Sequence, residues 1–154
     1  MSNERTHLFR AWPEGYAAMQ HLGELADGSG LEPSLLELVK MRASQLNGCA
    51  FCIDMHSKDA RAGGETEQRL YALSAWAETS FFTERERAAL ALTEAVTLIA
   101  DHHVDDVVEQ ASVHFAPDEL TRLLFAIIVI NSWNRLGITT GSPEPGSYEV
   151  PSGR

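Results

Sequence analysis

An apolar segment near the C-terminus limits the fold more than any other feature of the sequence. Residues Leu123–Ile130 are all apolar and lie within a longer helical segment, Glu119–Leu136, which follows Pro117-Asp118. A helix without a polar face must be buried, either centrally or against another subunit. The 8-residue run is shorter than the ~20 residues of a membrane-spanning helix. We therefore expect a helical bundle around this segment and no membrane partner.

The rest of the chain shows helix signals and no strand signals. Apolar residues recur at helical spacing over residues 13–26 and 33–47. Asn47-Gly48 is typical of a helix end, and Thr83–Glu86 has the pattern of a capping box. Further helices are expected over residues 49–63, 65–76, 83–100, 104–115 and 119–136. The sequence predicts an all-α, single-domain helical bundle of six to seven helices in residues 1–140, and a flexible C-terminal tail rich in Pro, Gly and Ser in residues 141–154.

The chain is acidic, with 12 Lys and Arg against 22 Asp and Glu, a net charge of −10 over 154 residues. Nucleic acids and anionic membrane surfaces bind basic patches, and this chain has no run of Lys or Arg. Neither is therefore an expected partner. Residues 1–7 are polar and lack the apolar core of a signal peptide. The expected location is cytoplasmic, where thiols are kept reduced.

The two cysteines of the chain form the pattern Cys49-x-x-Cys52-x-x-x-His56. On a helix that starts near Cys49, Cys52 lies ~60° from Cys49, and His56 lies ~40° from Cys52, so that all three share one face. The amides and dipole at a helix start favour a thiolate at the first sulfur. His56 can exchange a proton with the Cys52 thiol, and two sulfurs at this spacing can close a disulfide. The pattern favours a thiol redox site.

Glu37 joins this site only if the chain reverses direction at Asn47-Gly48. In one continuous helix, Glu37 would lie ~18 Å from Cys49 at 1.5 Å per residue. After a reversal, Glu37, which is 11 residues before Gly48, would face His56, which is 8 residues after it. A carboxylate that orients an imidazole serving a cysteine forms a proton relay. We therefore predict the reversal and a contact between Glu37 and His56.

Two other interpretations of these residues remain open. The cysteines can be small core residues, with His56 an ordinary surface or core histidine. Alternatively, Cys49, Cys52 and His56 can supply three zinc ligands, with Glu37 as a fourth. Structural zinc sites usually draw on a second ligand pair that this chain lacks.

Outside this motif, the polar residues favour structural roles. His102-His103 with Asp105-Asp106 offers metal-binding side chains, but it lies at a helix boundary, where polar residues are expected. Asn131, Asn134 and Arg135 are interpreted as structural, with Arg135 paired with an acidic group. The chain has no glycine-rich phosphate loop and no serine nucleophile elbow.

The segment from Glu37 to His56 resembles the core motif of the alkylhydroperoxidase D-like (AhpD-like), or carboxymuconolactone decarboxylase-like, family. The pattern is a Glu twelve residues before a Cys-x-x-Cys pair and a His four residues after the second Cys. Residues 130–136 also resemble a recurrent segment of the family's small single-domain members, and the similarity covers roughly residues 10–137. The resemblance implies an all-helical, AhpD-like fold assembled into homo-oligomers such as dimers, trimers or hexamers.

The resemblance also implies a thiol-dependent peroxidase that reduces organic hydroperoxides or hydrogen peroxide through a dithiol–disulfide cycle. By this likeness, Cys52 is the peroxidatic thiol and passes through a sulfenic acid, and Cys49 is the resolving thiol. Glu37 and His56 form the proton relay. No metal or organic cofactor is implied, and a lipoyl- or thioredoxin-type protein would supply the reducing equivalents. Alternatives are a protein or lipoamide disulfide reductase, or a non-catalytic redox-sensing oligomer.

One position departs from the family's best-known member, which carries a His between the cysteines that joins the relay. This chain has Phe51 there. The change removes one proton-transfer group and makes the approach to the sulfurs more apolar, so it bears on peroxidase efficiency. The family's decarboxylase branch lacks the cysteine pair, so decarboxylation is not expected.

Overall fold

The computed structural model describes residues 5–101, 104–141 and 143–152, and this part of the chain contains helices and no strand. The predicted all-α fold is therefore confirmed. In the described residues, seven helices, α2 to α8, correspond to the expected ones; the four-residue α1 is additional, and the 3-10 helix η1 replaces the end of one expected helix. The elements are α1 (Leu8–Ala11), α2 (Pro13–Asp27), α3 (Pro33–Asn47), α4 (Ala50–Ala62), α5 (Glu67–Ala72), η1 (Leu73–Glu78), α6 (Glu84–Thr97), α7 (Val104–Ser112) and α8 (Pro117–Thr140).

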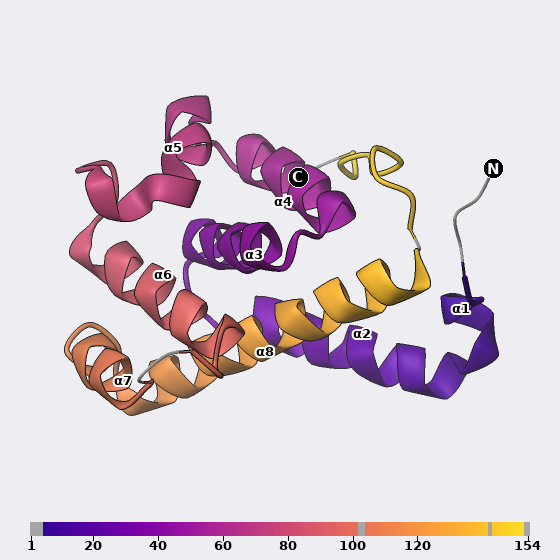
Figure 1. The fold of residues 1–154 in the computed structure, drawn as a ribbon, viewed down its shortest axis with the longest axis horizontal. Helices are drawn as coiled ribbons and strands as arrows, with labels where there is room; N and C mark the ends of the chain where they lie inside the picture. Colours follow the sequence, from indigo (N-terminus) through magenta and orange to yellow (C-terminus); the bar gives the residue numbers. More distant parts are fainter. Residues whose placement is uncertain (1–4, 102–103, 142, 153–154) are drawn as a thin grey trace.

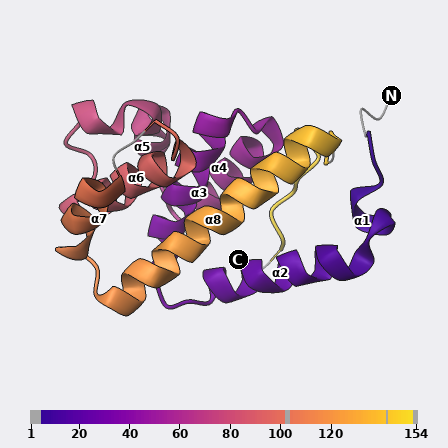
Figure 2. The same ribbon diagram turned by 60° about the horizontal axis from the view of Figure 1, so that its bottom comes forward.

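Helix α3 lies at the centre of the bundle and packs against α4, α6 and α8 (Figure 1). Helix α8 crosses this group, and α2 packs against its other side, as the turned view shows (Figure 2). The main core combines fully buried side chains of α3, α6 and α8, among them Val39, Leu92, Leu123 and Ile127. The central position of α3 places its side chains within reach of several other helices.

Helix α8 is longer than expected. It continues to Thr140, so by length and apolar composition it could cross a membrane, although the 8-residue apolar run indicated no such segment. In the bundle it is a core helix on one face, where Leu123, Ile127 and Asn134 are fully buried. On another face Phe125 and Ile128 are about half exposed. Burial within the protomer therefore accounts for one face of the apolar segment.

Several helix ends follow the sequence signals, and others differ. The capping box of Thr83 and Glu86 forms at the start of α6. That helix ends at Thr97, before the expected Ala100, because the backbone of Leu98 leaves the helical region. The expected helix over residues 65–76 is divided into α5 and η1, with a non-helical backbone at Ala75.

The chain after α8 has no regular structure in its described part, residues 143–152. Helix α8 ends at Thr140, and the φ of 70° at the following Gly141 is the left-handed conformation that suits glycine. The following segment turns back from the end of α8 toward α4 (Figure 1). There the Tyr148 hydroxyl donates to Asp59 over 2.7 Å, and Lys58 donates to the Tyr148 carbonyl over 2.9 Å. The division into a domain and a flexible tail stays a prediction, but Tyr148 is held against α4.

Candidate functional site

The turn between α3 and α4 reverses the chain as predicted. Helix α3 ends at Asn47, and Gly48 takes a left-handed backbone with φ 71°. Cys49 is the N-cap residue, immediately before α4. Glycine adopts this backbone without the steric penalty of a side chain. The two helices therefore lie side by side (Figure 1). The turn brings Glu37 of α3 to His56 of α4.

The two cysteines occupy the start of α4. Both are reduced and almost fully buried, with 2% of Cys49 and 3% of Cys52 exposed. The hydrogen bond with the Cys52 thiol lowers the pKa of Cys49 to about 6, against the opposite effect of burial; the Cys52 backbone amide and the Asn134 side chain lower it further. The same thiol–thiol contact and burial raise the pKa of Cys52. Near neutral pH, the pair carries one negative charge on Cys49, and Cys52 holds the shared proton.

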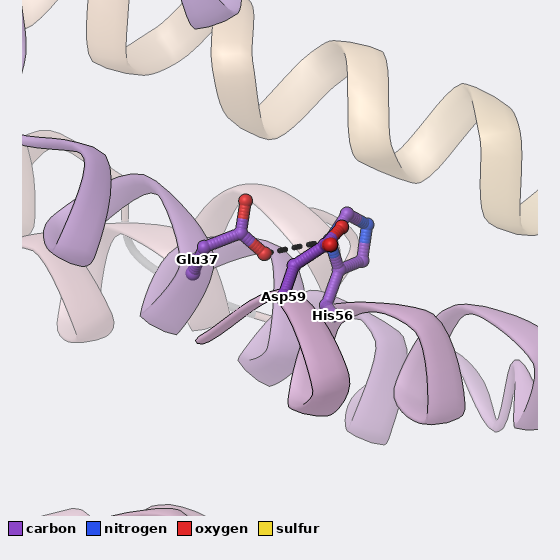
Figure 3. A group of neighbouring side chains, drawn as sticks. All are labelled: Glu37, His56 and Asp59. Carbon is purple, nitrogen blue, oxygen red and sulfur yellow. Dashed lines mark hydrogen bonds and ion pairs between the residues drawn. The ribbon is translucent and has the colours of Figure 1, made fainter. Parts of the chain in front are cut away.

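His56 and Glu37 form a buried pair beside the cysteines. The Nδ1 atom of His56 lies 2.8 Å from Oε2 of Glu37 (Figure 3), and His56 is 6% exposed. Burial raises the pKa of Glu37, but the hydrogen bond and charge of His56 and the charge of Lys40 outweigh it, so the pKa is lowered. Glu37 is thus an ionised acceptor, and His56 donates through Nδ1. The other ring nitrogen of His56 lies on the far side of the ring from Glu37 (Figure 3).

Cys52 and His56 line a cavity of about 350 Å³, here called the apolar cavity. Cys49 is not part of its wall. Most of the wall is aromatic or aliphatic and comes from α2, α4 and α8, including Tyr16, Phe51, Met55, Val129, Ile130 and Trp133. A small apolar molecule in this cavity would reach the Cys52 sulfur before that of Cys49.

A second cavity of about 500 Å³, here called the polar cavity, lies between α3, α4 and Tyr148. Its wall includes the carboxylates of Asp27, Glu37 and Asp59. His56 lines both cavities, as do Asp27, Lys40 and Met55. His56 therefore lies in the wall of both cavities, with Cys52 in the wall of the apolar one and Glu37 in the wall of the polar one.

Asn134 of α8 contacts both sulfurs, which the interpretation of this residue as purely structural missed. Its side chain is fully buried and lowers the pKa of each cysteine through a hydrogen bond. It also donates to Ser44 over 3.0 Å and accepts from Asn47 over 2.9 Å. The spacing of the polar residues along α8 indicates a buried hydrogen-bond network. It does not identify the partners of these residues, because the bonds join residues far apart in the sequence.

Within the part of the chain that the structure describes, Arg135 has no acidic partner, contrary to the prediction. It donates to the carbonyl and the side-chain oxygen of Asn131, at 3.0 and 2.8 Å. The interpretation of Asn131 as structural agrees with its buried bonds to Thr97 and Ile127. His102-His103 lies outside the described residues.

Asp59 is a further site residue that the sequence interpretation missed. Ligand atoms of Glu37, His56 and Asp59 all lie within 4.8 Å of one another (Figure 3). This group differs from the zinc alternative, which joined Glu37 and His56 to the two cysteines. Asp59 follows His56 by three positions on α4, a spacing that places both on one helix face.

Comparison with known proteins identifies the family. The Carboxymuconolactone decarboxylase family profile matches residues 13–95, more than half of the chain. The chain belongs to the carboxymuconolactone decarboxylase family. The matched region of this family member contains Glu37, both cysteines, His56 and Asp59.

Individual relatives agree with this assignment. The chain is 42% identical over 141 residues to the uncharacterized protein YdfG of Bacillus subtilis, covering 91% of this chain and 96% of YdfG. It is 40% identical, with a TM-score of 0.89, to an Agrobacterium tumefaciens protein of unknown function described as a candidate AhpD antioxidant defence protein; 93% and 99% of the two chains are covered. The debrominase Bmp8 is 20% identical, with a TM-score of 0.77 and coverage of 85% and 71%, a likeness of fold alone. The family fold is thus AhpD-like.

Proposed function

We propose that this protein is a thiol-dependent peroxidase that reduces organic hydroperoxides or hydrogen peroxide through Cys52 and Cys49. The observation that carries the proposal is the contact between the two reduced thiols beside the His56–Glu37 pair, with Cys52 in the wall of a cavity. A dithiol with one low pKa and a neighbouring imidazole meets the needs of thiol redox chemistry. Membership of a family with AhpD-like relatives supports the same conclusion.

The reaction starts at the sulfur that the cavity exposes. The Cys52 proton passes to the Cys49 thiolate through the bond between them, or to His56, and leaves a Cys52 thiolate beside the substrate. This thiolate attacks the terminal peroxide oxygen, and the O–O bond breaks. The leaving oxygen takes the proton that Cys49 or His56 had received and departs as the alcohol, or as water from hydrogen peroxide; Cys49 is then a thiolate, and Cys52 is a sulfenic acid. The peroxide is thereby reduced by two electrons.

Cys49 then resolves the sulfenic acid. Its thiolate attacks the Cys52 sulfur, the S–O bond breaks, and hydroxide leaves as water after taking a proton from His56. The two electrons lost by the thiols have reduced the peroxide to alcohol and water, and the disulfide is the oxidised form of the pair. An external dithiol, of lipoyl or thioredoxin type, reduces it and restores both thiols. Apart from this reductant and the peroxide, the chain itself supplies every group that the cycle requires.

The proton route uses the side of His56 that faces away from the substrate. Glu37 accepts from Nδ1 and stabilises the protonated imidazole, as the carboxylate of a catalytic triad does. Lys40 lies 3.0 Å from the other Glu37 oxygen and 2.6 Å from Asp27. These charges line the polar cavity, through which we propose that protons are exchanged while an organic substrate occupies the apolar cavity. We further propose a cytoplasmic homo-oligomer.

The low pKa of Cys49 favours a second candidate function. A disulfide reductase attacks its substrate with the thiolate at the start of a helix, and Cys49 has this position. Cys49 is buried and lies outside both cavity walls, so a protein disulfide would reach it only after a local opening. We rank this function second for that reason.

Single-cysteine variants test the proposal. Cys52→Ser is expected to abolish the consumption of cumene hydroperoxide. Cys49→Ser is expected to consume one equivalent and to stop at a Cys52 sulfenic acid that a dimedone probe labels. Unchanged peroxide consumption by Cys52→Ser contradicts the proposal. Rapid exchange with lipoamide without peroxide turnover by the wild type supports the reductase instead.

A further inference from the structure

We propose that Glu37, His56 and Asp59 form a binding site for a divalent transition-metal ion, with Zn²⁺ as the best-matched ion. The three side chains come from the facing helices α3 and α4, and their ligand atoms lie within 4.8 Å of one another (Figure 3). One imidazole nitrogen and two carboxylate oxygens suit Zn²⁺, and three protein ligands leave a fourth position for water. The adjacent polar cavity provides space for that water.

The geometry requires only small shifts: His56 and Glu37 would move slightly apart, and Asp59 would approach them. Tetrahedral ligands of Zn²⁺, at bond lengths of about 2.1 Å, lie about 3.4 Å apart. His56 Nδ1 and Glu37 Oε2 are already 2.8 Å apart, and a metal would replace the proton between them. Asp59 completes the set by rotating its carboxylate, which now accepts from the Tyr148 hydroxyl over 2.7 Å. Metal binding would therefore release one proton and compete with Tyr148.

The charges around the site favour a cation. Of the residues that line the polar cavity, four carry carboxylates, namely Asp27, Glu37, Asp59 and Glu65, and Lys40 carries an ammonium group. Lys40 is already paired with Asp27 at 2.6 Å and with the Glu37 oxygen that does not face His56. The Glu37 oxygen that faces His56 thus keeps its negative charge available to a metal.

Occupation of the site would block the proposed proton relay. The metal would take the place of the Nδ1 proton and neutralise Glu37, so His56 could no longer be stabilised in its protonated form. Zn²⁺ would then act as a reversible inhibitor of peroxide reduction. This consequence rests on the proposed function, whereas metal binding itself does not.

A direct measurement of metal binding tests the metal site independently of the proposed peroxidase function. Reduced protein is titrated with Zn²⁺ against a fluorescent zinc indicator, for the wild type, Asp59→Asn, and the double variant Cys49→Ser/Cys52→Ser. We expect one zinc per chain in the wild type and in the double variant, and an affinity at least about 10-fold weaker in Asp59→Asn. Asp118→Asn, the same change at an exposed position on α8, is the matched control and is expected to bind as the wild type does.

The result also distinguishes a sulfur site from the proposed one. Loss of binding in the double cysteine variant with full binding in Asp59→Asn overturns the proposal and supports the cysteine-based zinc alternative. Equal affinities of the wild type, Asp59→Asn and Asp118→Asn also overturn it. With Co²⁺ in place of Zn²⁺, we expect no thiolate-to-cobalt absorption band. A protein without peroxide turnover that still binds Zn²⁺ through Asp59 contradicts the proposed function and leaves the metal site supported.

Discussion

Asn47, the last residue of α3, donates its side-chain amide to the Oδ1 atom of Asn134 over 2.9 Å. This bond ties the reversing turn to the C-terminal half of α8, and the same Asn134 side chain contacts both sulfurs. Asn47 also donates to Asn131. The position of the cysteines relative to the apolar cavity therefore depends on a helix that carries neither of them.

Replacement of Asn134 should affect both stability and thiol chemistry. Asn134→Ala leaves buried partners at Ser44 and Asn47 without this amide and is expected to lower the free energy of unfolding by about 2–3 kcal/mol. Asn134→Asp keeps the shape but places a carboxyl group beside the thiolate, so we expect the pKa of Cys49 to rise above 6. Urea unfolding measures the first effect, and thiolate absorbance measures the second. An unchanged thiol titration in Asn134→Asp contradicts the assigned contact.

The reduced protein should show one unusually acidic thiol. Because the folded-state pKa of Cys49 is about 6, below its ordinary value, its thiolate is present above that pH and is lost as the pH falls through it. The pKa of Cys52 is raised, so its ionisation should not contribute near neutral pH. Ultraviolet thiolate absorbance is expected to rise by one equivalent per chain with a midpoint near pH 6. Cys49→Ser should lose this step, and its retention in that variant would contradict the assignment.

Glu37→Gln should slow peroxide reduction while the site keeps its shape. The amide can still accept from His56, but it no longer stabilises a protonated imidazole. We expect a decrease of about 10²-fold in kcat/KM for cumene hydroperoxide. The exposed Glu24 provides the control Glu24→Gln, which should retain wild-type activity. Equal rates for both variants would remove Glu37 from the relay.

Gly23 offers a way to test the apolar cavity. A Cβ atom there would approach Trp133 and Val129 at ordinary van der Waals distances of 3.7 and 3.9 Å. Gly23→Ala should therefore be accommodated and should stabilise α2 by up to about 1 kcal/mol. Gly23→Leu projects into the cavity and is expected to reduce turnover of cumene hydroperoxide much more than that of hydrogen peroxide. Equal effects on the two peroxides would show that the organic substrate does not use this cavity.

The exposed face of α8 should mediate self-association. Phe125 and Ile128 are 49% and 48% exposed and follow each other by one helical turn. Burial of such side chains contributes roughly 1.5–3 kcal/mol each. The double variant Phe125→Glu/Ile128→Glu is expected to shift the protein to the monomer in light scattering after gel filtration. The control Val113→Glu, at another exposed apolar residue, should keep the wild-type mass.

Local signals in the sequence predict much of this site. Asn47-Gly48 marks the reversal, and the counted distances from that turn place Glu37 opposite His56. Helical spacing likewise places Cys52 and His56 on one wall. These predictions succeed because each depends on one turn and two short helices.

Features that depend on distant contacts were not predicted. Asn134 reaches the sulfurs only because α8 crosses α3, and Tyr148 reaches Asp59 only because the chain turns back after Gly141. The extra turn of α8 and the non-helical backbone of Ala75 within η1 were likewise not predicted. Residue spacing carries no information on which of these long-range contacts form.

The two cavities that meet at His56 draw on different parts of the chain. The reactive groups belong to α3 and α4, whereas α2 and α8 supply much of the apolar wall. Mutations of the apolar-wall residues of α2 or α8, as distinct from Asn134, are therefore expected to change which molecules enter without altering the groups to which we assign electron and proton transfer. Such a division allows descendants of one ancestor to diverge in selectivity while they keep a common reaction, and it indicates where a redesign of specificity should begin.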